Sequence, residues 1–114
     1  MPLSISGRAE ADLTHQYRWY LANANAEVAE RFLKAFDVTV EKLARQPGLG
    51  RARKFRAPEL AGLRSFPVGG RFGVHLIFYR ESGDALSSER VMPGARQLPR
   101  RLLEPPQDFG PLQD

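Results

Sequence analysis

The sequence predicts an α+β fold, in which a short N-terminal strand and an αα-hairpin pack on a small antiparallel β-sheet. Two observations predict it. Apolar residues recur at helical spacing through two consecutive segments of the first half, and they alternate with polar or small residues in the second half. The strands of the second half are joined by short turns, so they must pair antiparallel. A chain of 114 residues has room for one modest core.

The N-terminal half begins with a strand and continues into two helices. Apolar and polar residues alternate at positions 3–5, and Ser6 or Gly7 can cap the first helix. The apolar stripe of this helix comprises Ala9, Leu13, Tyr17, Tyr20 and Leu21. Asn25 can cap a second helix, whose stripe covers residues 29–43 until "QPGLG" ends it, because proline cannot continue a helix.

The second half of the chain is expected to form the sheet. Pro67 has no N–H to donate, so its strand should lie at an edge or end there, before the turn signal Gly69–Gly70. After the turn "ESGD", the last strand covers residues 86–92. Residues 87–89 are polar and bury little apolar surface, so we expect this strand to pair weakly.

The central strand lies in "RFGVHLIFYR" and has two distinct faces. Alternate apolar residues from Phe72 to Phe78 share one face, whereas His75 and Tyr79 lie on the opposite face. This alternation fits a sheet with one face packed and the other in water.

Composition excludes several kinds of site. The absence of cysteine excludes disulfides, thiolate zinc sites and cysteine nucleophiles, and two histidines, His15 and His75, make a histidine-rich metal centre improbable. No apolar run approaches the roughly 20 residues of a membrane helix, and no secretory signal pattern is present. We expect a cytoplasmic protein without a metal site, with one domain over residues 1–103 and a flexible, Pro-rich tail over residues 104–114.

Basic charge is concentrated in the second half. Residues 1–50 carry six Lys or Arg and six Asp or Glu, so the whole net charge of +4 arises after residue 50. Between Arg51 and Arg101, eleven basic residues stand against four acidic ones. Such a surface is either simply solvated or attracts an anionic partner, which would be a nucleic acid or an acidic protein segment.

Several short motifs follow one another along the chain: "AEADL", "YLAN", "AERFLKAF", "LARQPGLGR", "PELAGLRSFPVGGRFGVHLIFYR" and "RVMPGAR". Their ordered combination resembles the RelE/ParE family of bacterial toxins, specifically its ParE branch. The resemblance implies a cytoplasmic toxin of a type II toxin–antitoxin pair that uses no cofactor. It also implies a cognate antitoxin, ParD-like or similar, that neutralises the toxin in an oligomeric complex. Promoter DNA would be contacted only through the antitoxin.

The resemblance leaves two activities open, because ParE-like members poison DNA gyrase whereas RelE-like members cut mRNA at the ribosome, and the fold is shared. RelE-like toxins resemble one another in a Tyr or His near the C-terminal end, and "GARQLPRRLLEPP" has neither. Where ParE-like sequences often read "VLHGARD", this one has Pro93 and Gln97 in "VMPGARQ". We therefore favour a toxin that binds gyrase or a similar large target, with a RelE-like endoribonuclease as the alternative. A relic that binds only its antitoxin is a third possibility.

Catalysis would have to use His75 and Tyr79 as an acid–base pair, with cations supplied by Arg64, Arg90 and Arg96. A packed or half-exposed role in the strand is the simpler interpretation of His75. We therefore assign no catalytic residue.

Several residues are candidates for binding the target or the antitoxin: Arg64, Arg90, Arg96, Trp19, Arg100 and Arg101. Arg64 and Arg90 could instead make internal pairs that hold the sheet together. For Arg90, the partner would be Glu81 or Glu89, which are close in sequence. Arg96 follows a Pro-Gly break and should be exposed.

Trp19 falls off the apolar stripe of the first helix, on the face that carries Asp12 and Gln16. It either folds over the seam of the hairpin or serves as an exposed aromatic anchor. We expect the antitoxin to place a helix along the groove between hairpin and sheet, and an acidic or extended segment along the basic edge of the sheet.

Overall fold

The computed structural model describes residues 1–94 and 98–105, so residues 106–114 of the predicted tail lie outside the described residues. The helices are α1 (Gly7–Asn23), α2 (Ala26–Arg45) and α3 (Leu98–Leu103). The strands are β1 (Leu3–Ile5), β2 (Arg51–Ala52), β3 (Arg64–Pro67), β4 (His75–Ser82) and β5 (Ala85–Pro93). Three 3-10 turns connect them: η1 (Pro47–Leu49), η2 (Pro58–Leu60) and η3 (Gly70–Phe72). Within the described ranges, no helix is both long and apolar enough to cross a membrane.

The predicted helical hairpin is confirmed, and side chains cap both of its N-termini. Ser6 Oγ accepts a hydrogen bond from the N–H of Ala9 at 3.0 Å, and Asn25 Oδ1 accepts one from Val28 at 2.9 Å. The second helix ends at Arg45, directly before "QPGLG". These boundaries follow from local chemistry, since caps and a proline define them.

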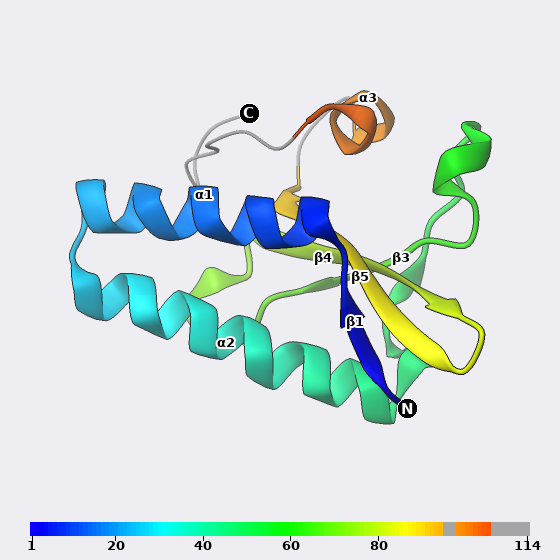
Figure 1. Ribbon diagram of the computed structural model, residues 1–114, viewed down its shortest axis with the longest axis horizontal. Helices are drawn as coiled ribbons and strands as arrows, with labels where there is room; N and C mark the ends of the chain where they lie inside the picture. Colours follow the sequence, from blue (N-terminus) through cyan, green and yellow to red (C-terminus); the bar gives the residue numbers. More distant parts are fainter. Residues whose placement is uncertain (95–97, 106–114) are drawn as a thin grey trace.

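Within the described residues, the strands form one mixed sheet in the order β1-β5-β4-β3-β2 (Figure 1). β1 pairs with β5 in parallel, with Leu3 opposite Leu86, and the other neighbours are antiparallel. The predicted α+β class is confirmed, and β1 adds a parallel pair to the antiparallel sheet that we expected. β5 lies in the interior of the sheet with a neighbour on each side. It forms backbone ladders with both neighbours, and its weak pairing in the free protein stays a prediction.

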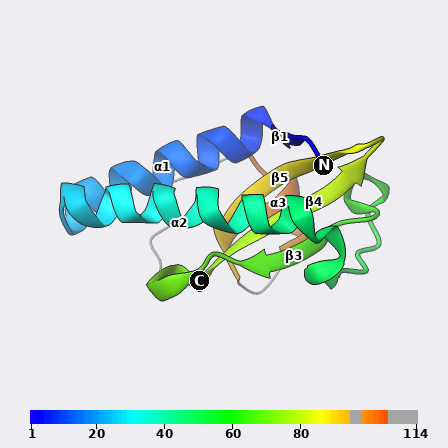
Figure 2. The same ribbon diagram turned by 90° about the horizontal axis from the view of Figure 1, so that it is seen from below.

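The helices α1 and α2 cover one face of the sheet (Figure 2). Ile77 and Tyr79 of β4 are buried on this face, in one cluster with Phe32 of α2. Phe72 joins the same cluster from η3, because β4 begins only at His75 and the 3-10 turn interrupts the alternation. Phe72 therefore does not share a face with Phe78, which corrects the prediction, whereas Phe78 lies on the face opposite to Tyr79 as predicted.

The opposite face of the sheet is covered as well, which corrects the expectation of one face in water. A second buried cluster there comprises Leu60, Leu63, Phe78, Met92 and Leu102. Leu102 belongs to α3, which Figure 2 shows on the side of the sheet away from α2. A helix of six residues spans fewer than two turns, so its sequence shows no recognisable helical periodicity. The sequence therefore did not predict this second layer.

β3 ends at Pro67, which confirms that the strand cannot continue through this residue. The chain then passes through η3 rather than through a two-residue hairpin turn. Gly70 adopts a positive φ of 65° there, a conformation that favours glycine.

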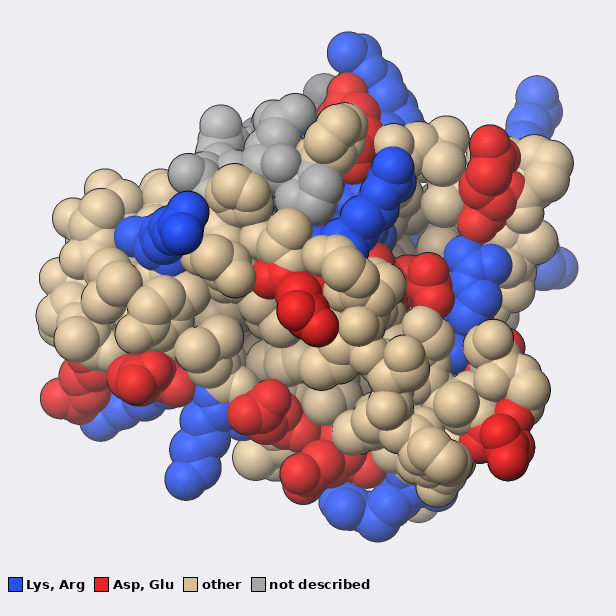
Figure 3. Space-filling view, viewed as in Figure 1, with Lys and Arg blue, Asp and Glu red and all other residues tan. Residues whose placement is uncertain are grey.

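Charged side chains of both signs are interspersed over α1 and α2 on the face that Figure 3 shows. Arg31 and Glu27, one turn apart on α2, form an exposed ion pair at 2.5 Å. This balance agrees with the equal counts of acidic and basic residues over positions 1–50. The excess of basic charge therefore belongs to the sheet half of the molecule.

Candidate functional site

A buried ion pair between Arg90 of β5 and Asp12 of α1 joins the sheet to the helices. Arg90 Nε lies 2.8 Å from Asp12 Oδ2 and Nη2 lies 3.0 Å from Oδ1, so the pair is bidentate. Asp12 Oδ2 also accepts a hydrogen bond from the N–H of Val91 at 2.9 Å. The side chains of Arg90 and Asp12 are 3% and 1% exposed. Burial raises the pKa of Asp12, and the hydrogen bonds from Arg90 and Val91 oppose that rise.

Arg90 also holds α3 against the sheet. Its Nη1 donates to the carbonyl oxygens of Leu102 at 2.8 Å, Glu104 at 2.7 Å and Arg101 at 3.3 Å. These carbonyls lie at the C-terminal end of α3, where helix carbonyls lack partners within the helix and favour a cation. One guanidinium thus connects α1, β5 and α3.

Arg90 therefore makes an internal pair, as one of our two interpretations predicted, but its partner is Asp12 and not Glu81 or Glu89. Asp12 is 78 residues away in sequence. The buried residues of α1 are Ala9, Asp12, Gln16 and Tyr20. Asp12 thus lies on the side that meets the sheet, which the apolar stripe alone did not indicate. An acidic residue at helical spacing from Ala9 and Tyr20 was the available signal.

His75 is buried in the core on the helix side of the sheet. Its Nε2 lies 2.9 Å from the Tyr20 hydroxyl oxygen, and the Phe32 ring packs against the imidazole with centroids 4.8 Å apart. Burial lowers the pKa of His75 to about 4, so the ring is neutral at pH 7. A neutral imidazole that is 1% exposed has no access to an external substrate.

Tyr79 and Arg64 meet at the turn η1 and attach it to the sheet. The Tyr79 hydroxyl donates to the carbonyl of Pro47 at 2.7 Å and accepts from the N–H of Gly50 at 2.8 Å, and Arg64 Nη1 donates to the Gly50 carbonyl at 2.8 Å. A Cβ at position 50 would overlap the Tyr79 hydroxyl, so this position requires glycine. Tyr79 lies four residues from His75 on one strand, roughly 13 Å away, so the two form no acid–base pair.

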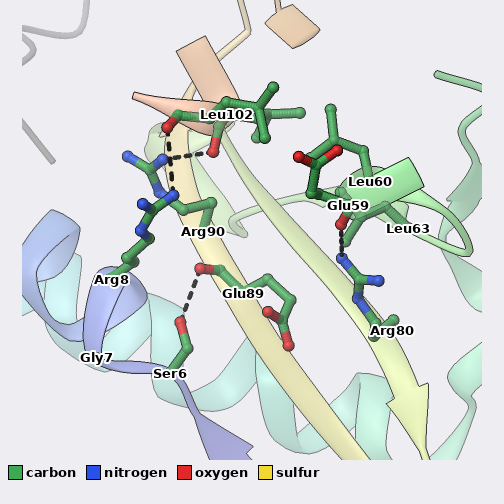
Figure 4. Close-up of a pocket in the computed structure, with 11 residues that line it drawn as sticks. Ser6, Gly7, Arg8, Glu59, Leu60, Leu63, Arg80, Glu89, Arg90 and Leu102 are labelled. Carbon is green, nitrogen blue, oxygen red and sulfur yellow. Dashed lines mark hydrogen bonds between the residues drawn. The ribbon is translucent and has the colours of Figure 1, made fainter. Parts of the chain in front are cut away.

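A groove of about 380 Å³ lies between α1, α3 and η2, with β4 and β5 beneath it (Figure 4). Its charged lining comprises Arg8, Glu59, Arg80, Glu89 and Arg90. Arg80 connects the strand to η2 by donating to the carbonyls of Ala61 at 2.8 Å and Glu59 at 2.9 Å. Because both signs of charge line this groove, it does not select an anion by charge alone.

A second hollow, of about 410 Å³, opens between the α1–α2 turn and η3. Trp19, Val28, Phe72 and Val74 form its apolar lining, and Arg71 adds a cation. The Trp19 ring packs edge-on against Tyr20 with centroids 5.5 Å apart, and Trp19 stays half-buried. Trp19 therefore covers the core and also lines this hollow, and its role as an anchor for a partner stays a prediction. We call this the Trp19 hollow.

The remaining arginine candidates lie near the C-terminal end. Arg100 is exposed, and its Nε lies 3.2 Å from Glu104 Oε2. Arg101 is half-buried on α3, and Arg96 lies outside the described residues. In the part of the chain that the structure describes, no group of three or more His, Cys, Asp or Glu is placed to hold a metal ion.

The sequence matches a family model described as the ParE toxin of the type II toxin–antitoxin system parDE over residues 3–98. No curated protein matches the sequence. Among solved structures, the chain is similar to one chain of the chromosomal ParDE system from P. aeruginosa. The TM-score is 0.68 and the identity 22%, over 83% of this chain and 97% of that one.

Two further structures share the fold. A YoeB/ParE toxin from Agrobacterium tumefaciens has a TM-score of 0.53 and 19% identity, over 83% of this chain and all (100%) of that one. A chain of the heterotetrameric YoeB-YefM complex from Staphylococcus aureus has a TM-score of 0.50 and 15% identity, over 83% and 98%. At these identities the likenesses concern the fold alone.

Replacing Asp12 by alanine should lower the free energy of unfolding by about 3–5 kcal/mol, because Arg90 would stay buried without a counter-ion. Urea denaturation at pH 7 measures this loss. Asp37→Ala, at an exposed position of α2, is the control and should change stability by less than about 0.5 kcal/mol. Equal effects of the two substitutions would contradict the role of the pair.

Stability should also depend on His75 through pH. The pKa of His75 is about 4 in the folded chain and 6.5 ordinarily, so the unfolded chain binds more protons between these values. The contribution is complete above pH 6.5 and is lost as the pH falls toward 4, by about 3 kcal/mol in total. Urea denaturation of the native chain and of His75→Gln at pH 7 and pH 4 measures it. If the free energy of unfolding fell by the same amount in the native chain and in the His75→Gln variant, His75 would not be buried as a neutral ring.

Proposed function

Because the chain belongs to the ParE toxin family of type II toxin–antitoxin systems, we propose that it inhibits DNA gyrase or a similarly large target by binding, and that a cognate antitoxin neutralises it. The observation that carries this proposal is the placement of His75 and Tyr79. Both side chains are buried and hydrogen-bonded within the protein. Cleavage of RNA through its 2′-hydroxyl needs an acid and a base that reach the substrate, and neither residue does. Binding without chemistry is therefore the better-supported mode of action.

The internal bonds of Arg64 and Arg90 narrow the binding surface. Arg90 is buried, and Arg64 holds the carbonyl of Gly50. Contact with partners then falls to the other candidates, namely Trp19, Arg96, Arg100 and Arg101.

The Trp19 hollow suits one segment of the antitoxin. An amphipathic helix could place a large apolar side chain against Trp19 and Val74, which is 44% exposed, and a carboxylate against Arg71. Such a helix would cover apolar surface and would pair Arg71, which makes no ion pair with another described residue. Contact with promoter DNA would occur through the antitoxin.

Trp19→Ala should weaken antitoxin binding about 30-fold, because an aromatic anchor in a pocket contributes about 2 kcal/mol or more. Leu21→Ala is the matched control, since Leu21 is exposed on the same helix and does not line the hollow. Calorimetric titration with the antitoxin encoded beside the toxin measures both, after thermal melting shows that each variant is folded. If both variants bound the antitoxin with equal affinity, the Trp19 hollow would not be part of the interface.

The proposed mode of action is tested by inducing the chain in growing bacteria and following DNA and mRNA in parallel. We expect DNA breaks and filamentation while transcripts stay intact. Rapid mRNA cleavage with normal replication would favour the endoribonuclease instead, above all if His75→Gln or Tyr79→Phe abolished it. Normal growth would indicate a relic that only binds its antitoxin.

A further inference from the structure

A run of basic residues lies at the outer edge of the sheet, and the proposed function does not use it. Residues 42–80 contain nine Lys or Arg and a single acidic residue, Glu59. Four of the nine fall within six consecutive positions on β2 and the chain that follows it (green, at the right of Figure 1). We call these four residues the basic edge: Arg51, Arg53, Lys54 and Arg56.

The protein does not neutralise the basic edge. Arg51, Lys54 and Arg56 are exposed. None of the four forms an ion pair with another described residue, and the ion pairs in the described part of the chain include those of Arg31, Arg90 and Arg100. Four like charges without carboxylates repel one another, so a polyanion that bound here would relieve the repulsion.

Arg53 is fixed in place within the basic edge. Its guanidinium lies over the Phe55 ring, 5.6 Å from the centroid, and Nη1 donates to Ser65 Oγ at 3.0 Å. Burial and the neighbouring charge of Arg51 lower the pKa of Arg53. Arg53 is thus held by internal contacts, and the cations of the basic edge that remain exposed to a ligand are Arg51, Lys54 and Arg56.

The surroundings of the basic edge favour phosphate over an acidic peptide. Neither the groove beside α3 nor the Trp19 hollow is lined by any of its four residues. Peptides that bind tightly place apolar or aromatic anchors in such pockets. Contact with phosphates needs only cations at an accessible surface, and releases bound counter-ions from the nucleic acid.

We propose that the basic edge binds the sugar–phosphate backbone of a nucleic acid. This contact is additional to the protein partners proposed above and does not depend on them. Contacts of this kind position a protein on a nucleic acid without reading its sequence, so DNA and RNA share the required chemistry.

The test compares two triple variants of the full chain that have equal net charge. Arg51→Gln, Lys54→Gln and Arg56→Gln remove the exposed cations of the basic edge. The control removes three exposed cations of the helices by Arg18→Gln, Arg31→Gln and Lys34→Gln. Fluorescence anisotropy follows binding to a labelled DNA duplex of about 20 base pairs and to an RNA strand of equal length, between about 50 and 200 mM salt. Thermal melting checks that both variants are folded.

We expect the basic-edge variant to bind at least about tenfold more weakly at low salt than the native chain, with its salt slope reduced by about 2 to 3. The control should stay close to the native chain. The DNA and RNA probes show which nucleic acid is preferred, and binding to either supports the proposal. Equal losses in both variants would overturn it, since net charge alone would then explain binding. It would also be overturned if neither nucleic acid bound while a poly-glutamate peptide bound the native chain and not the basic-edge variant.

Discussion

The bidentate pair between Arg90 and Asp12 holds together the three layers of this molecule. A buried arginine loses its hydration, and that cost is offset only when every partner has good geometry. Here the partners come from three separate segments: a carboxylate of α1, the strand β5 itself and the carbonyls that end α3. If any of these segments detached, the Arg90 guanidinium would become exposed to water or would stay buried without its partner. The helical hairpin, the sheet and the short C-terminal helix are therefore coupled.

This coupling determines which side chains remain available for partners. The polar groups that resemble a reactive set, His75, Tyr79 and Arg64, are used to pack the core or to hold η1. What stays accessible is peripheral: the Trp19 hollow at one end, the groove beside α3 and the basic edge. A protein built in this way can offer several surfaces to large partners, and it keeps His75 and Tyr79 away from solvent.

Local signals predicted the parts of the fold that depend on neighbours in sequence. The caps Ser6 and Asn25, the proline after α2 and the strand end at Pro67 each act within a few residues, so they could be recognised. The pair of Arg90 and Asp12 could not, because helical spacing can place Asp12 on the side that meets the sheet but does not identify its partner 78 residues away. The alternation predicted for β4 holds within the strand, but Phe72 was placed on the wrong face because η3 interrupts the alternation before the strand begins. The surfaces for partners stay predictions, but the burial of Arg90 removes this residue from them, and the sequence alone could not show that burial.

The Arg90 pair also affects how genetic selection on this protein can be interpreted. If expression of the chain stops growth as proposed, any change that removes the folded protein restores growth, and substitution of a residue on which three segments depend is one such change. Survivors altered at Asp12, Arg90 or the glycine beneath Tyr79 would carry little folded protein, and their lesions would identify no binding surface. Only survivors in which the folded protein still accumulates identify residues that bind the target.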